Sequence, residues 1–168
     1  MSPVTRHALE QQLAHLHART FGWAMAACDY RRDDALDVVQ TTYLKVLDGR
    51  ARFSGRSSFT TWLFAVVRQT AVDLRRRRSL RAELLRRWLP RADAAPPPPA
   101  GDDRVGEQVR RALAALPRRQ REVAELVFYQ DLTIEEAAEV MAVSLGSART
   151  HYDRAKRSLA RTLAELVP

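Results

Sequence analysis

The chain has 168 residues, 46% of them hydrophobic, which is enough apolar material for one ordinary domain or two small ones. The formal net charge of +8 indicates a polyanionic partner, most often nucleic acid and less often a membrane surface. The single cysteine, Cys28, excludes an internal disulfide, and its apolar neighbours predict a buried thiol rather than a redox group.

Several classes of protein are excluded by what the sequence lacks. The first twenty residues contain no continuous apolar stretch, so we expect no signal peptide, and no apolar run is long enough to span a bilayer. We find no catalytic Cys/His pair, phosphate-binding glycine loop or metal-ligand cluster. We therefore expect a cytoplasmic, non-enzymatic protein with no membrane insertion, no cofactor, no metal and no appended C-terminal sensor domain.

Four consecutive prolines, residues 96–99, punctuate the chain because they cannot lie inside a helix or a central strand. We predict a helical domain over residues 1–91, an extended acidic and proline-rich linker over 92–104, and a second helical domain over 105–168. Residues 92–107 carry a net charge of −3. No stretch alternates apolar and polar residues as a half-buried strand would, so the predicted fold class is all-α.

Helical spacing predicts a helix around residues 34–47. Its predicted inner stripe is Leu36, Val39, Tyr43, Val46 and Leu47, and its predicted outer side carries Asp34, Asp37 and Thr41. An acidic side over an apolar stripe suits docking on a basic protein partner. An amphipathic helix with a solvated acidic side explains the pattern equally well.

A second long helix is predicted from about Ser58 through the arginine run, with Phe59, Leu63, Val66 and Thr70 on one face. Residues 68–91 contain nine arginines and two acids, a net charge of +7. Capture of an unpaired DNA strand needs such a cationic track together with a pocket for an extruded base. We place that pocket at loop 55–58 and assign Phe59 and Trp62 to the core, with stacking on DNA as their alternative role. The predicted DNA-contacting residues are Arg56, Ser57, Ser58, Arg68, Arg75, Arg76, Arg77 and Arg78.

The C-terminal part predicts four helices. Val105, Val109, Ala112, Leu113 and Leu116 mark the first, and Pro117 fits the first turn of the second. Thr133 and Glu136 form a capping-box pattern that begins the third, with Ile134, Ala137, Ala138 and Met141 facing inward. After a break at residues 142–144, the fourth has the inner stripe Ala148, Tyr152, Ala155, Leu159, Leu163 and Leu166.

The last two predicted helices, separated by a tight break, have the helix-turn-helix arrangement, in which the second helix enters the DNA major groove. Residues 147–161 hold five basic side chains and one acid. Arginine can contact guanine with two hydrogen bonds, so the predicted base-reading residues are Arg149, Thr150, Asp153 and Arg154. Lys156 and Arg157 are predicted to hold phosphates. A solvated basic face on a packing helix is the alternative.

Residues 116–123 (LPRRQREV), 132–141 (LTIEEAAEVM) and 145–150 (LGSART) resemble region 4 of the extracytoplasmic-function sigma factors. That family reads the minus-thirty-five promoter element with this domain. Ala142 stands where the family usually has a glycine in the turn, and His151 where it often has an arginine.

Residues 34–46 (DALDVVQTTYLKV) are similar to sigma region 2.2, and residues 53–64 and 68–78 resemble regions 2.3 and 2.4. The resemblance implies that Asp34, Asp37 and Gln40 contact core RNA polymerase, and that the later segments hold the melted non-template strand of the minus-ten element. It also implies that the linker threads the polymerase cleft, although a simple spacer is an equal alternative. An anti-sigma protein, or modification of Thr41 or Thr42, would be a means of control.

Together these features predict a sigma factor that binds core RNA polymerase and directs promoter recognition, promoter opening and transcription initiation on duplex and melted promoter DNA. A stand-alone helix-turn-helix regulator is the first alternative, but it leaves the N-terminal motifs unexplained. An enzyme with a helix-turn-helix tail, such as a recombinase, is the second, and it lacks a recognisable nucleophile.

Overall fold

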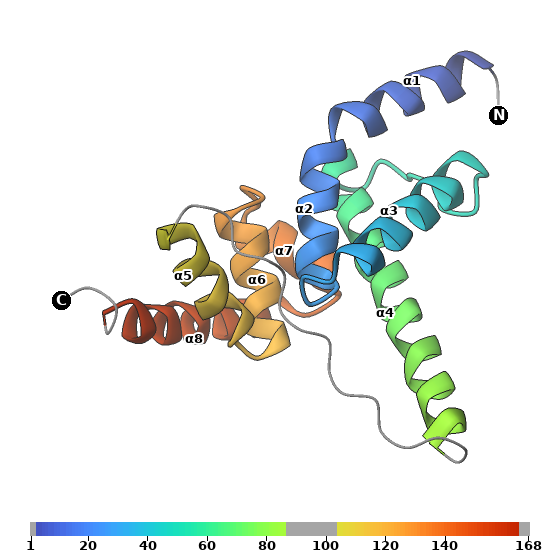
Figure 1. Ribbon diagram of the computed structural model, residues 1–168. Coiled ribbons are helices and arrows are strands. Elements are labelled where there is room, and N and C mark those ends of the chain that lie inside the picture. The colour runs from blue at the N-terminus through green and yellow to red at the C-terminus, as the bar shows by residue number, and fades with distance from the viewer. Residues whose placement is uncertain (1–2, 87–103, 165–168) are drawn as a thin grey trace. The chain divides into compact units, whose positions relative to one another are not determined.

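The computed structural model describes residues 3–86 and 104–164. This part of the chain contains eight α-helices and no strand, which confirms the all-α prediction (Figure 1). The helices are α1 (Pro3–His15), α2 (His17–Ala27), α3 (Arg32–Leu47), α4 (Phe59–Arg86), α5 (Arg104–Ala114), α6 (Arg118–Phe128), α7 (Ile134–Met141) and α8 (Leu145–Ala164).

Contacts group the described residues into two compact units. The first contains the residues up to Arg52 and those from Val66 to Arg86, and the second contains residues 53–65 and those from Arg104 onward. Because the division falls within the continuous helix α4, the first two turns of that helix are grouped with the second unit and the remainder with the first.

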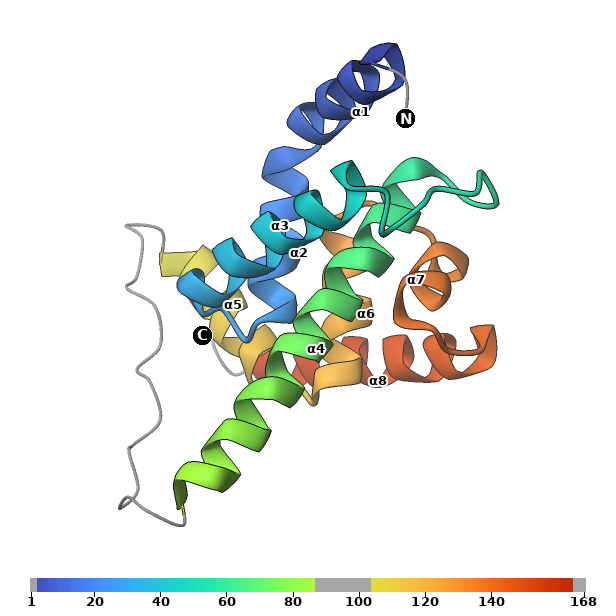
Figure 2. The same cartoon turned by 90° about the vertical axis from the view of Figure 1, so that its right-hand side faces the viewer.

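In the first unit, α2 packs on α3, and α1 contacts both helices (Figures 1 and 2). Trp23 of α2 is fully buried, and the other buried apolar residues of this helix are the alanines Ala24, Ala26 and Ala27, whose small side chains let the helix backbones approach closely. The buried side chains of α2, α3 and the following part of α4 include Ala24, Ala27, Ala35, Val38, Val39, Val46, Val67 and Ala71.

The chain reverses tightly between α2 and α3. Asp29 and Tyr30 both have positive φ angles, 54° and 59°, a region that residues other than glycine rarely adopt. The Cys28 N–H donates to the Ala24 carbonyl at 2.9 Å, and the Tyr30 N–H donates to the Met25 carbonyl at 2.8 Å. These bonds satisfy two carbonyls at the end of α2, as the last turn of a helix requires.

The helix predicted around residues 34–47 is confirmed as α3, but two of its residues face the opposite way from the prediction. Asp34, predicted on the outer side, is only 3% exposed, whereas Leu36, predicted on the inner stripe, is 47% exposed. Thr42 is fully buried, so the interpretation of this side chain as a surface modification site is wrong. The Asp37 side chain is exposed, as predicted.

In the second unit, α6, α7 and α8 pack against one another, and α5 packs on α6 and α8 (Figure 2). Leu113, Leu116, Ala124 and Ala155 form a buried cluster. The predicted inner stripe of α8 is confirmed where it is described: Ala148 and Ala155 are buried, and Tyr152 and Leu159 are half-buried. The Leu163 side chain and Leu166 lie outside the described residues.

The predicted starts of α6 and α7 are close to the observed ones. Pro117 is the N-cap of α6, one position before the predicted first turn. The capping box of α7 is confirmed, because the Glu136 N–H donates to Thr133 Oγ1 at 3.1 Å and the Thr133 N–H donates to Glu136 Oε2 at 2.9 Å. Helix α7 ends at Met141, and the residue that caps it, Ala142, has a left-handed backbone with a φ of 53°.

The predicted linker, residues 92–104, lies outside the described residues except for its last position. Arg104 begins α5, so the helix starts at the residue where the linker was predicted to end. Glu107, counted with the acidic linker, is also helical and accepts hydrogen bonds from Arg110 and Arg111 at 2.8 and 3.0 Å. These two bonds lower the pKa of the Glu107 carboxyl group below its usual value.

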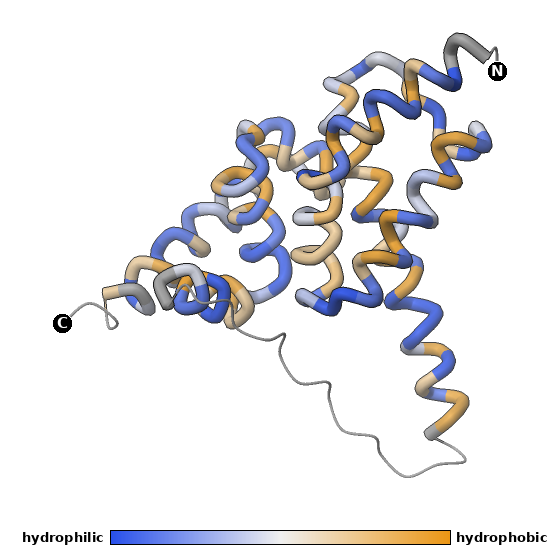
Figure 3. Tube along the Cα trace, turned by 45° about the horizontal axis from the view of Figure 1, so that its top comes forward, coloured by the Kyte–Doolittle hydropathy of each residue, from blue (hydrophilic) through white to orange (hydrophobic). Residues whose placement is uncertain are grey.

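None of the described helices combines the length and the apolar character needed to cross a membrane. Hydrophilic residues recur along the described helices, as the hydropathy colouring shows (Figure 3).

The left-handed residue at the end of α7 predicts a stabilising substitution. An L-residue in this conformation costs roughly 1–2 kcal/mol, part of which glycine recovers despite its greater freedom in the unfolded chain. We expect Ala142→Gly to raise the free energy of unfolding by about 1 kcal/mol, measured by thermal or urea denaturation. Ala160→Gly, the same change at an exposed position inside α8, should lower it by about 1 kcal/mol. Equal effects of the two substitutions would show that the left-handed backbone is not responsible.

Candidate protein and nucleic-acid interfaces

The exposed side of α3 forms a continuous stripe, which we name the α3 stripe. It consists of Asp33, Leu36, Asp37, Gln40 and Leu44, spaced three and four residues apart as one face of a helix requires. The two leucines are 47% and 51% exposed, and acidic and amide side chains flank them. Large apolar side chains exposed in such a polar rim are typical of a surface that binds another protein. A partner for this stripe would need apolar surface bordered by basic side chains.

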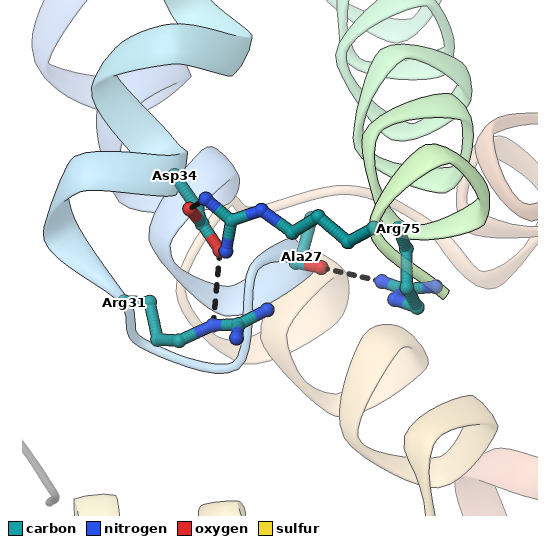
Figure 4. Close-up of polar contacts among 5 residues, drawn as sticks. Ala27, Arg31, Asp34 and Arg75 are labelled. Carbon is teal, nitrogen blue, oxygen red and sulfur yellow. Dashed lines mark hydrogen bonds and ion pairs between the residues drawn. The ribbon is translucent and has the colours of Figure 1, made fainter. Parts of the chain in front are cut away.

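Asp34 lies on the opposite side of α3, where it is buried among arginines. Its carboxylate accepts from Arg31 Nε at 2.9 Å and pairs with both terminal nitrogens of Arg78 on α4. Arg75, one turn earlier on α4, donates from Nη2 to the Ala27 carbonyl at the end of α2, at 2.8 Å. Figure 4 shows the contacts of Asp34 with Arg31 and of Arg75 with Ala27. We name the cluster of Asp34, Arg31, Arg78, Arg75 and the Ala27 carbonyl the Asp34 hub.

A second polar link joins α3 to α4. The Lys45 ammonium group donates to Thr70 Oγ1 at 3.0 Å and lies 3.6 Å from an Asp73 carboxylate oxygen. Gln69 donates to the other Asp73 oxygen at 2.9 Å. Helices α3 and α4 are therefore held together by charged contacts from both ends of α3.

The arginine run of α4 presents its members to two sides of the helix. Arg75 and Arg78 bond within the Asp34 hub, although Arg78 is itself exposed. Arg76 and Arg77 are also exposed, and no acidic side chain of the described residues pairs with these two. Arg68, also predicted to contact DNA, is half-buried nearer the start of α4. Of the other arginines in the predicted cationic track, Arg81 is exposed, the Arg86 side chain is not described, and Arg87 and Arg91 lie outside the described residues.

The predicted base pocket, loop 55–58, is an irregular segment directly before α4. Gly55 has a φ of 74°, and Arg56 and Ser58 are exposed, with Ser57 half-buried. Ser58 also has a structural role, because its hydroxyl oxygen accepts from the Thr61 N–H at 3.0 Å and so caps the start of α4.

Three aromatic rings border this loop. Phe53, Phe59 and Trp62 contact one another, with ring centroids 5.3–5.5 Å apart. Phe59 and Trp62, assigned to the core from the sequence, are half-buried and not part of the fully buried core, while Phe53 is exposed. Such tilted and edge-to-face pairs stabilise the conformation of the segment that carries them.

Cys28 is buried beside the Asp34 hub, which confirms its interpretation as a small core residue. Burial, reinforced by the Asp34 charge, raises the pKa of the thiol to about 11. The thiolate that would act as a nucleophile is therefore scarce at neutral pH.

The outer side of α8 carries the predicted groove-reading residues. Arg149, Thr150, Asp153, Arg154, Lys156 and Arg157 are all exposed, so the predicted outer stripe is confirmed as a surface. Ala148 and Ala155 anchor the same helix in the core. A groove-reading helix needs this division, because one side must pack while the other carries long hydrogen-bond donors.

Four members of this surface have intramolecular partners that the sequence did not predict. The Thr150 hydroxyl donates to the Gly146 carbonyl, one turn earlier on α8, at 2.9 Å. Arg149 donates to Glu135 of α7 at 3.2 Å, which links the two helices of the helix-turn-helix. Lys156 pairs with Asp153 at 3.2 Å and lies 4.6 Å from the centre of the Tyr152 ring. Within the described chain, no acidic side chain pairs with Arg154 or Arg157.

Comparison with known proteins agrees with this arrangement. Residues 13–81 match the family described as Sigma-70 region 2, and residues 106–159 match Sigma-70, region 4. The ECF RNA polymerase sigma factor SigF of Caulobacter vibrioides is 34% identical over 160 residues, covering 93% of this chain and 86% of that protein. The RNA polymerase sigma factor CarQ of Myxococcus xanthus is 31% identical over 137 residues, covering 79% and 76%.

Solved structures show the same fold. The sigma factor RpoE of Bartonella quintana, solved in complex with the anti-sigma factor NepR, has a TM-score of 0.76 at 23% identity, covering 94% of this chain and 97% of that one. CnrH, solved in complex with the cytosolic domain of CnrY, has a TM-score of 0.63 at 25% identity, covering 95% and 89%. With both sigma domains present in chain order, the chain belongs to the extracytoplasmic-function sigma factors, a non-catalytic family, and it binds core RNA polymerase and directs recognition of promoter DNA.

Proposed function

We propose that the two parts of the chain have different functions. Residues 1–91 would bind core polymerase and hold the minus-ten element, and residues 105–168 would bind the minus-thirty-five element. Residues 92–104 would join the two parts. The observation that carries this proposal is that the two outer surfaces differ in chemistry: the α3 stripe is acidic and apolar, and the outer side of α8 is basic.

Core polymerase would bind the α3 stripe through Asp37 and Gln40, with Leu36 and Leu44 supplying apolar contact. Acidic side chains around exposed leucines favour a basic protein surface and disfavour DNA, whose phosphates they repel. Asp34 is better suited to holding the fold, because its carboxylate is buried and paired with Arg31 and Arg78.

The melted strand would bind loop 55–58 and the exposed arginines of α4. Arg56, Arg76 and Arg77 are exposed cations that can hold phosphates, and the loop beside the aromatic cluster would accept one extruded base. This process uses binding energy and needs no catalytic group, so we propose that the chain is not an enzyme. We also propose a cytoplasmic location, because core RNA polymerase transcribes DNA in the cytoplasm.

The outer side of α8 would read duplex DNA in the major groove. Arg154 has no acidic partner in the described residues and can make two hydrogen bonds to a guanine edge, while Thr150 and Asp153 offer further base contacts. Lys156 and Arg157 would hold phosphates. Since the similar Bartonella quintana protein was solved with an anti-sigma factor, we also propose a protein inhibitor of that kind for this chain.

The loop offers a direct test of strand capture. We expect Ser57→Phe to reduce promoter melting by core polymerase carrying this chain about tenfold or more, because the bulky ring fills the space that an extruded base needs (about 1.4 kcal/mol per tenfold). Melting is measured by permanganate reactivity of unpaired thymines, and initial duplex binding by gel shift. Ser57 is preferable to Ser58, whose replacement would also remove the cap of α4.

Ser54→Phe is the matched control, because Ser54 is an exposed serine of the same irregular segment that lies outside the proposed pocket. It should leave melting unchanged. If Ser57→Phe melts the promoter as well as the parent, loop 55–58 does not hold the base.

A further inference from the structure

Two consecutive arginines of the run, Arg76 and Arg77, have no acidic partner in the described residues. Residues three apart on a helix share a side, and Arg75 and Arg78 both face the hub that joins α2, α3 and α4. Arg76 and Arg77 point away from it into solvent. The formal charge of the run therefore overstates the charge that a DNA strand meets.

The Asp34 carboxylate binds the Arg78 guanidinium group in the way that a DNA phosphate would. The guanidinium group presents both terminal nitrogens to the two carboxylate oxygens, which is the geometry that arginine also uses toward phosphate. The Asp34 side chain is 4% exposed and the Arg78 side chain 48% exposed. The arginine thus reaches the surface, and among the described residues its acidic partner is Asp34.

We propose that Asp34 is a positioning residue that takes the place of a DNA phosphate at Arg78, locks α3 to α4, and leaves contact with the melted strand to Arg76 and Arg77. The inference rests on the proposed strand capture by α4. It assigns opposite roles to neighbouring arginines, and it moves Asp34 from the polymerase-contacting residues to those that hold the α3 stripe in place relative to the strand-binding side of α4.

The salt dependence of binding tests this division. Affinity for DNA falls as the salt concentration rises, and each phosphate neutralised on a single strand adds about 0.7 to the steepness of log affinity plotted against log salt concentration. This steepness, taken as a positive number, is called the slope below. The measurement uses core polymerase carrying the full chain and a fluorescent single-stranded oligonucleotide with the minus-ten sequence of a promoter that this holoenzyme opens. Core polymerase contributes the same amount to the slope in every measurement. A difference in slope between two variants therefore reports the phosphate contacts of the substituted arginine.

We expect Arg76→Ala and Arg77→Ala each to lower the slope by about 0.7 and Arg78→Gln to leave it unchanged. Asp34→Asn should raise it by about 0.7, because Arg78 is then free to bind a phosphate. A carboxylate with only a structural role would not increase the slope. Since Asp34→Asn leaves two arginines without their acid and its fold is at risk, the double variant Asp34→Asn with Arg78→Gln is decisive. The Asp34–Arg78 ion pair is then absent while Arg31 remains, and because Arg78 no longer carries a charge the slope should equal that of the parent.

The outcomes separate the inference from the function on which it rests. If Arg78→Gln and the double variant lower the slope as much as Arg76→Ala, with unchanged helicity, Arg78 contacts the strand and the inference is wrong. If neither Arg76→Ala nor Arg77→Ala changes the slope, the arginine run does not hold the strand, and the proposed strand capture by α4 fails instead.

Discussion

Replacing Asp37 with Arg and Gln40 with Ala together should reduce the affinity for core polymerase about 30-fold or more. Both side chains lie in the centre of the α3 stripe and are exposed, so the change leaves the buried side of α3 intact. Placing a cation against a basic partner surface costs about 2 kcal/mol or more, which corresponds to that loss. The dissociation constant is measured with fluorescently labelled chain and sigma-free core polymerase, and helicity by circular dichroism.

Glu10→Arg is a suitable control for this variant. It reverses the charge of an exposed acid on α1 that pairs with Arg6, four residues away on the same helix, and exposed pairs of this kind contribute little to stability. Polymerase binding should therefore be unchanged. Equal weakening by both variants would indicate a general effect of charge, and no weakening by either would mean that the interface lies elsewhere on the chain.

Arg154→Ala should reduce the preference for one base pair of the minus-thirty-five element by about 5- to 150-fold. That range corresponds to the 1–3 kcal/mol that a two-hydrogen-bond contact with a base contributes to discrimination. The measurement compares the affinities of holoenzyme for promoters that carry each of the four base pairs at every position of the element. The variant should lose discrimination at one position and keep it at the others.

Lys156→Ala provides the contrast, because Lys156 is predicted to hold a phosphate. It should weaken binding to all promoter variants alike and lower the salt slope by about one. Its contacts with Asp153 and the Tyr152 ring keep the ammonium group on the outer side of α8. If the two variants behave identically, the division of base and phosphate contacts on this surface is incorrect.

The elements that were predictable from the sequence are those whose signals are local. The capping box of α7 involves residues three apart, and the long apolar stripe of α8 repeats often enough to define its inner side. The orientation of α3 was less predictable. Periodicity assigns leucine to the inside and aspartate to the outside, and neither rule applies to Leu36 or Asp34.

The reason for this failure is that the partners of Asp34 are distant in sequence. Arg78 is 44 residues away, and nothing near Asp34 except Arg31 indicates that a buried carboxylate would be compensated. For the same reason, the sequence does not predict which arginines of the run bond to α2 and α3 and which are left to solvent, because the four residues are identical and consecutive. Local patterns predict where a helix lies, but the pairing of its charges depends on which other helix crosses it.

The contact between Arg75 and the Ala27 carbonyl has a consequence for the order in which the first unit folds. The residues after α2 satisfy two carbonyls of its last turn, and the Ala27 carbonyl accepts from a side chain 48 positions later in the chain. In a nascent chain that ends before α4, the Ala27 carbonyl lacks this donor and accepts from water instead. We expect this carbonyl to lose its contact with water when α4 docks on the end of α2.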